Sequence, residues 1–171
     1  PAYNGYFVKY RLYFLGKWIK YGSYYGTKIL RLFRKNHFKI SREMNEHIMI
    51  EGPTGDLNFD IIHEDRKGLD SWILKHVKYA ELEANELLKQ VKVDDFANFF
   101  GTQPQRKRWI RLNIWNKIMP IFFRAFIYFF YRYIIRLGFL DGRIGLIFHF
   151  LHGLWYPFLI DIKYFKMKNL N

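Results

Sequence analysis

The sequence has no cysteine and none of the common motifs for phosphate loops or activated nucleophiles. Without cysteine the chain can form no disulfide framework, no thiolate metal site and no cysteine nucleophile. It also lacks a glycine-rich phosphate loop, an HExxH pair of zinc-binding histidines, a GxSxG serine turn and any Asp-x-Asp. These absences argue against the P-loop, dinucleotide-binding, zincin and α/β-hydrolase classes.

Aromatic residues are abundant in place of these motifs. The 171 residues include 18 Phe, 13 Tyr and 5 Trp, and half of the chain is hydrophobic. A disordered basic tail would carry far fewer apolar side chains, so this composition predicts a chain that packs or seeks a membrane. The length fits a domain of ordinary size.

Acidic residues are scarce in the C-terminal part. Residues 1–100 hold 16 basic and 13 acidic side chains, whereas residues 101–171 hold 12 basic and only 2 acidic, Asp141 and Asp161. This basic segment is also the most apolar one. Because a nucleic acid offers nothing for an apolar face to bind, the combination favours an anionic membrane surface as the partner.

The N-terminal part has strand-like patterns. Residues 6–35 alternate aromatic and basic side chains between glycines, which is typical of short strands and turns. Residues 47–50 and 58–63 are two further strand candidates, separated by the turn Gly52-Pro-Thr-Gly55. We therefore expect a hairpin or strand pair over residues 47–63.

The pattern changes to helical after Gly68. Apolar residues recur every three or four positions up to about Val91, which predicts an amphipathic helix of about six turns. Trp72, His76 and Tyr79 lie along one side of this helix. We interpret them as core residues in preference to ligand contacts.

The C-terminal segment divides into two apolar pieces, 114–137 and 145–163, joined by residues 138–142. The 17 residues from Ile144 to Ile160 are uncharged, which predicts an interfacial or re-entrant helix, with a full span as the alternative. The first piece carries basic residues that would form one stripe on a helix facing lipid headgroups. They are Lys117, Arg124, Arg132 and Arg136.

Candidate chemistry lies between residues 31 and 65. Arg31 and Arg34 could clamp phosphate oxygens, although a solvated basic edge has the same spacing. The run Glu43-Met-Asn-Glu46-His47 could supply a general base, or could be a charged surface loop. His63, followed by two acids, could bind a divalent cation or a diphosphate.

Taken in order, these segments resemble the C-terminal half of bacterial family 2 glycosyltransferases, of the branch that builds lipopolysaccharide core or exopolysaccharide. The resemblance covers about 130 residues in seven short motifs, none diagnostic alone. They are Gly16-Lys-Trp-Ile19, Arg31-Leu-Phe-Arg34, Glu43-Met-Asn-Glu-His47, Gly52-x-x-Gly55-x-Leu57, His63-Glu-Asp65, Trp72-x-x-Lys-His76-x-x-Tyr79-Ala80-x-x-Glu83-Ala84 and Leu137-Gly-Phe-Leu-Asp-Gly142.

The resemblance implies an α/β fold, namely the C-terminal portion of a GT-A fold followed by amphipathic membrane-associated helices. Residues 1–100 would be the acceptor side of the catalytic domain, and residues 101–171 a basic, aromatic helical region. In this family an earlier Asp-x-Asp holds Mg²⁺ or Mn²⁺ with the donor diphosphate. Because the chain begins at Pro1 without that motif, we expect the donor-binding half to be missing and the fragment alone to be inactive.

The resemblance also implies roles for particular residues. Glu46 matches the general base of such inverting enzymes, and Glu43 competes for this role because His47 stands where the family commonly has aspartate. His47 would contact substrate, and His63 would bind the metal or diphosphate. Arg31 and Arg34 would hold the diphosphate or an anionic acceptor.

The expected partners are a nucleotide-sugar donor, a lipid-linked or polysaccharide acceptor and an anionic membrane, with no nucleic acid. The excess of basic residues favours the cytoplasmic face of the bacterial inner membrane. A noncatalytic membrane-binding or scaffold module is the alternative, because Asp-x-Asp is absent.

Overall fold

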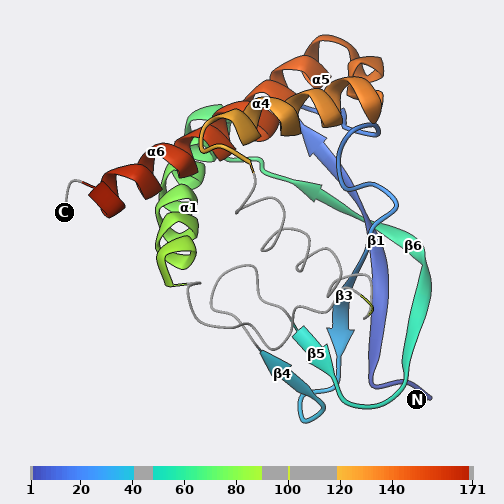
Figure 1. The fold of residues 1–171 in the computed structure, drawn as a ribbon. Coiled ribbons are helices and arrows are strands. Elements are labelled where there is room, and N and C mark those ends of the chain that lie inside the picture. The colour runs from blue at the N-terminus through green and yellow to red at the C-terminus, as the bar shows by residue number, and fades with distance from the viewer. Residues whose placement is uncertain (1, 41–47, 90–99, 101–118, 170–171) are drawn as a thin grey trace.

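A computed structural model of the chain describes residues 2–40, 48–89, 100 and 119–169. In this part the chain has a mixed α/β fold, as the sequence predicted. Figure 1 shows strands on one side of the molecule, helix α1 on the other and a pair of helical arms across one end.

The main sheet is built around one long strand, β1 (Gly5–Phe14). Strands β2 (Lys17–Trp18) and β3 (Lys28–Phe33) pair with β1 in antiparallel fashion, and β6 (Thr54–Glu64) pairs with it in parallel. The alternation of aromatic and basic residues thus does produce strands. Side chains from β3, β1 and β6 consequently lie side by side on one face of the sheet.

The predicted pairing over residues 47–63 is wrong. Strand β5 (Ile48–Ile50) pairs instead with β4 (Phe38–Ile40), and β6 joins β1. The intervening turn explains this arrangement, because Asn4 donates its backbone N–H to Pro53 and its side-chain amide to the carbonyl of Glu51, both at 2.8 Å. These bonds hold the turn against the start of β1, so β6 enters the main sheet in parallel.

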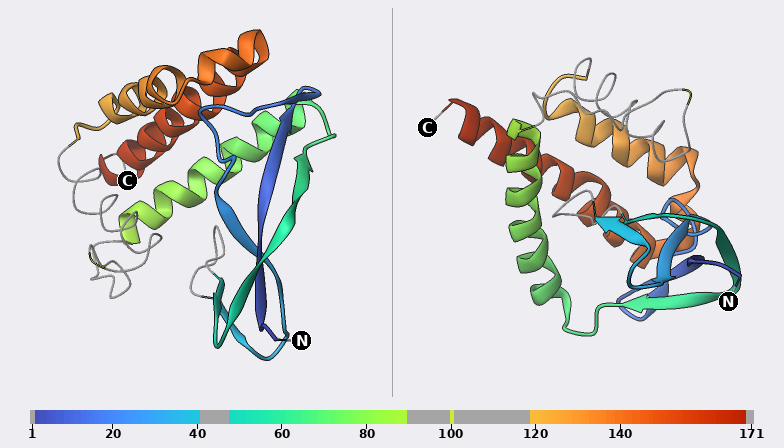
Figure 2. Two further views of the ribbon diagram at one scale, coloured as in Figure 1. Left: turned by 90° about the vertical axis from the view of Figure 1, so that its right-hand side faces the viewer. Right: turned by 90° about the horizontal axis from the view of Figure 1, so that it is seen from below.

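The amphipathic helix is confirmed as α1 (Leu69–Lys89). Its buried side chains include Trp72, His76, Ala80 and Ala84, which recur every four residues on one face. Trp72 joins Phe14, Ile19 and Phe148 in the main apolar cluster. The start of α1 therefore contacts the end of β1, where Trp72 meets Phe14, and the helix packs against α6, which it crosses in the right-hand view of Figure 2.

The C-terminal residues form two helical arms, which we call the C-terminal hairpin (residues 123–169). The predicted division into two pieces is confirmed for the described residues, since the arms meet at a short 3₁₀ helix, η3 (Gly138–Asp141). Its remaining elements are α4 (Phe123–Phe130), the π-helix η2 (Tyr131–Ile135), α5 (Gly142–Phe148), the π-helix η4 (His149–Trp155) and α6 (Tyr156–Asn169). Pro157 lacks the N–H that would bond to the carbonyl of Gly153, so the helix widens where η4 precedes α6.

The predicted basic stripe does not face outward. Arg132 is only 2 % exposed, and the side chain of Arg124 is paired with Asp161 between the arms. Arg136 is exposed, and Lys117 lies outside the described residues. Periodicity groups side chains on one face of a helix but does not say which way that face points, and here the second arm covers it.

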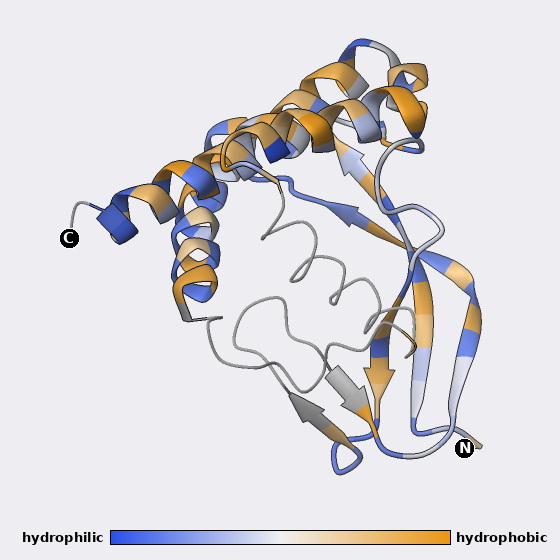
Figure 3. Cartoon of the chain, viewed as in Figure 1, coloured by the Kyte–Doolittle hydropathy of each residue, from blue (hydrophilic) through white to orange (hydrophobic). Residues whose placement is uncertain are grey.

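Many exposed side chains of the hairpin are apolar instead, and Figure 3 shows hydrophobic residues along both of its arms. Its exposed large side chains include Phe123, Phe126, Ile134, Leu140, Ile147 and Phe150. The helical run Gly138–Asn169 is long and apolar enough to cross a membrane, judged by length and composition.

The hairpin is fastened to the loop between β2 and β3. Asp141, almost fully buried, accepts the backbone N–H of Tyr21 at 2.9 Å and that of Lys20 at 3.3 Å. Arg132 Nε donates to the carbonyl of Gly22 at 2.6 Å. Gly22 has a φ of +62°, and an added Cβ there would lie 2.4 Å from the carbonyl oxygen of Arg132, so this joint requires glycine.

Candidate functional site

A cavity of about 1570 Å³ lies between the main sheet, α1 and the C-terminal hairpin. Most of its charged side chains lie where the ends of the strands meet the start of α1, and aromatic and aliphatic side chains of the helices line much of the rest. The first region includes Tyr10, Arg31, His63, Asp65, Lys75 and His76, and the second includes Ile127, Phe130, Tyr131 and Ile135.

Three neighbouring strands bring Arg31, Tyr10 and His63 together on the cavity wall. The rings of Tyr10 and His63 are stacked, with centroids 5.6 Å apart and planes 3° from parallel. The guanidinium carbon of Arg31 lies 5.1 Å from the centroid of Tyr10. Tyr10 on β1 thus orients a cation from β3 and an imidazole from β6 toward one region of the cavity.

His63 is biased toward its neutral form. Partial desolvation against the sheet lowers the pKa of His63 below its ordinary value, and the positive charges of Lys75 and Arg31 lower it further, against an opposing effect of Asp65. At neutral pH the ring therefore has one nitrogen that can donate a hydrogen bond and one that can accept one.

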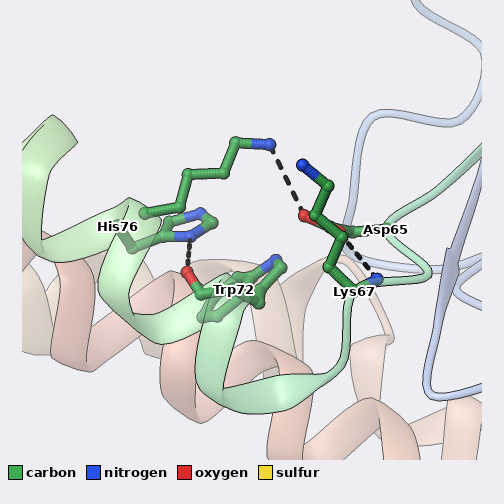
Figure 4. Close-up of polar contacts among 5 residues, drawn as sticks. Asp65, Lys67, Trp72 and His76 are labelled. Atoms are coloured by element: carbon green, nitrogen blue, oxygen red, sulfur yellow. Dashed lines mark hydrogen bonds and ion pairs between the residues drawn. The ribbon is translucent and has the colours of Figure 1, made fainter.

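Asp65 lies just beyond β6 and is already engaged within the protein. It accepts the backbone N–H of Lys67 at 3.2 Å and approaches Lys75 Nζ at 3.5 Å, as Figure 4 shows. The bond from Lys67 is the main reason that the pKa of Asp65 is lowered, and Lys75 adds to the effect. Asp65 therefore stays ionised and fixes Lys75 at the edge of the cavity.

His76 is held one turn along α1 from Trp72. Its Nδ1 lies 2.8 Å from the carbonyl oxygen of Trp72, and the two rings stack with centroids 3.6 Å apart (Figure 4). Burial lowers the pKa of His76. A neutral ring that donates from Nδ1 leaves Nε2 as an acceptor, and the rings of Tyr156 and His152 lie 5.1 and 5.7 Å away.

The structure brings together two of the residues that the sequence singled out, Arg31 and His63, which both line the cavity. Arg34 follows the end of β3, donates its backbone N–H to the carbonyl of Asn4 at 2.9 Å and is not among the lining residues. Glu43, Glu46 and His47 lie outside the described residues.

Sequence reasoning missed the contributions of Tyr10 and Lys75 and interpreted the aromatic side of α1 only as core. Trp72 does belong to the core, but Trp72, His76 and Tyr79 also line the cavity. The four-residue spacing of Trp72 and His76 was the available signal, because on a helix it stacks the two rings. Tyr10 gave no such signal, since its neighbours come from other strands.

Within the described ranges, no three His, Asp or Glu side chains gather closely enough to hold a metal ion. His63 is a single potential metal ligand there, and Asp65 is already bound by Lys67 and Lys75. The expected Mg²⁺ or Mn²⁺ thus finds no complete ligand set in this part of the chain.

In comparisons with protein-family models, curated proteins and solved structures, nothing matches this chain.

Proposed function

We propose that the chain is the acceptor-side and membrane-docking part of an inverting glycosyltransferase that resembles family 2. It would transfer a sugar from a nucleotide-sugar to a lipid-linked or polysaccharide acceptor in the synthesis of cell-envelope glycans. The observation that carries the proposal is the juxtaposition of Arg31, Tyr10 and His63 at the charged wall of a large cavity beside an apolar helical hairpin.

This arrangement suits a reaction in which negative charge develops on a leaving diphosphate. As the acceptor oxygen forms a bond to the anomeric carbon, the bond from that carbon to the diphosphate breaks and its electron pair leaves with the diphosphate. Arg31 and His63 would stabilise that charge by hydrogen bonds within a partly desolvated wall.

The proton of the acceptor hydroxyl must go to a base in the same step. We assign this role to Glu46, with Glu43 as its competitor, on the basis of the family resemblance. The described residues do not supply a set of ligands for a metal ion.

We further propose that the protein lies at the cytoplasmic face of the bacterial inner membrane with the C-terminal hairpin in the interface. The exposed apolar side chains of the hairpin support this placement, since such side chains gathered on one surface are typical of contact with a membrane or a partner. An enzyme held there would meet a lipid-linked acceptor in a fixed orientation.

A noncatalytic membrane-binding module is the second candidate. It is favoured by the same apolar surface together with the missing Asp-x-Asp. The two proposals differ in one measurable respect, because only the enzyme needs the charged wall of the cavity.

His63→Gln tests the proposed enzyme. In the full-length protein, assayed in native membranes with its nucleotide-sugar, we expect this variant to reduce sugar transfer about a hundredfold, because glutamine lacks the ring that stacks on Tyr10 and so no longer holds its N–H group in place for the diphosphate. His37→Gln is the matched control, since His37 is not among the lining residues. Equal transfer by both variants would remove His63 from the site, and no transfer by the wild-type protein with any donor would favour the noncatalytic module.

A further inference from the structure

The cavity is larger than an acceptor hydroxyl and its sugar require. Its volume of about 1570 Å³ exceeds the roughly 300–1,000 Å³ of ordinary small-molecule sites. Charged groups are concentrated on the wall formed by the ends of the strands and the start of α1. The other side is largely apolar, with Ile127 from α4, Leu87 from α1 and Ile160 from α6, and its charged groups are Glu83 and the Arg124–Asp161 pair.

The apolar wall continues onto the surface of the hairpin. Phe130, Tyr131 and Ile135 line the cavity and are also 57, 45 and 72 % exposed. They adjoin other exposed apolar residues of the same arm, among them Ile134 at 49 %. If this surface lies in the membrane interface, these three residues form an apolar path from the lipid into the cavity.

One cation at the charged wall is available to an anion. Four carboxylates line the cavity: Asp65 approaches Lys75, Glu64 binds Arg66 at 3.0 Å, Asp161 binds Arg124, and Glu83 is buried on α1. Arg31 instead has no carboxylate partner among the described residues, and its guanidinium lies over the ring of Tyr10. A guanidinium so placed presents its N–H groups to phosphate oxygens.

We propose that this cavity binds a phosphate-bearing lipid, with its hydrocarbon chain between the hairpin and α1 and its phosphate at Arg31. The lipid enters from the bilayer past Phe130, Tyr131 and Ile135. The identification of this lipid as the acceptor rests on the proposed glycosyltransferase function. The binding site itself rests only on the two chemically different walls and the continuous apolar mouth.

Dodecyl phosphate is a suitable probe because it has one phosphate and one chain. The full-length protein in phosphatidylcholine nanodiscs is titrated calorimetrically with dodecyl phosphate, dodecanol or inorganic phosphate, and the signal of empty nanodiscs is subtracted. We expect saturable binding of dodecyl phosphate that is at least tenfold tighter than the binding of dodecanol or of inorganic phosphate. The proposal would be overturned if inorganic phosphate bound as tightly as dodecyl phosphate, so that the hydrocarbon chain contributed nothing. It would also be overturned if dodecyl phosphate showed no saturable binding.

Variants locate the two ends of the lipid. Ile127→Trp fills the apolar wall and should weaken dodecyl phosphate binding at least tenfold, whereas Ile134→Trp, outside the cavity on the same arm, should leave it unchanged. Leu87→Trp and the substitution at an exposed position of the same helix, Leu74→Trp, repeat this comparison on α1 in case Ile127→Trp does not fold.

The charged end has a matched pair on strand β3. Arg31→Ala should lower the affinity for dodecyl phosphate but not for dodecanol. Lys28 pairs with Asp56 and does not line the cavity, so Lys28→Ala should alter neither affinity. Equal affinities for all variants that fold would contradict the site. Lipid binding without sugar transfer would retain the site and reject the glycosyltransferase function, so the two failures are distinguishable.

Discussion

Asp161→Ala is expected to lower the free energy of unfolding by about 3–5 kcal/mol, because it removes the buried carboxylate that balances the charge of Arg124 inside the hairpin. Asp161 is fully buried, with an exposed fraction of 0 %. One of its carboxylate oxygens accepts Arg124 Nε at 2.7 Å and also Nη2, and the other accepts the backbone N–H of Phe122 at 2.9 Å. Since domains are commonly stable by about 5–15 kcal/mol, this single change would bring the hairpin close to unfolding.

Urea denaturation in mild detergent, followed by far-ultraviolet circular dichroism, measures this loss. Asp56→Ala is the control, because the pair of Asp56 with Lys28 is half exposed and should contribute less than about 1 kcal/mol. The double variant Arg124→Leu/Asp161→Leu should recover much of the stability, since it removes both charges together. A loss of less than about 1 kcal/mol for Asp161→Ala would show that the pair does not hold the two arms together.

Glu46→Gln is expected to reduce sugar transfer by about a thousandfold or more in the full-length protein, with little change in nucleotide-sugar binding. Glutamine keeps the size of the side chain but cannot take the proton of the acceptor hydroxyl. Steady-state transfer of a radiolabelled sugar measures the rate, and equilibrium binding of the nucleotide-sugar measures the affinity for the donor.

Glu43→Gln is the matched comparison, three residues earlier in the same motif. Transfer within about tenfold of wild type is expected for this variant. Loss of a charge near the base changes the strength of the base only modestly, whereas loss of the base itself abolishes proton transfer. Near-normal turnover with Glu46→Gln would exclude Glu46 as the base. If Glu43→Gln were the inactive variant, the role would pass to Glu43.

Local periodicity predicted the elements of the fold but not their partners. Helix α1 could be recognised because its apolar residues recur at the helical period over five turns, which few other structures produce. The strands near residues 50 and 60 were also recognisable, but their pairing depends on bonds from Asn4 to Glu51 and Pro53, which lie almost fifty residues away. Alternation identifies a strand and says nothing of its neighbour.

The two acids of the C-terminal segment show the same limit. Their position among aromatic residues was visible, yet their role depends on distant groups, namely the backbone of Lys20 and Tyr21 for Asp141 and Arg124 for Asp161. The basic stripe was predicted to face lipid headgroups because arginine is costly in hydrocarbon, but a buried carboxylate stabilises Arg124 inside the hairpin.

The candidate site could be predicted only in part for the same reason. Arg31 and His63 carry recognisable phosphate-binding chemistry, and both line the cavity. That Tyr10 stands between them follows from the order of β3, β1 and β6, which no local pattern encodes. The cavity itself requires the hairpin to fold back over α1 and the sheet.

The most direct test of the glycosyltransferase account is to incubate the full-length protein, in native membranes with Mg²⁺ or Mn²⁺, with a panel of radiolabelled nucleotide-sugars. The account predicts that at least one donor transfers its label to a lipid-linked or polysaccharide product, and that Glu46→Gln or His63→Gln suppresses this transfer. Absence of labelled product with every donor, from protein shown to be folded and membrane-bound, would contradict it.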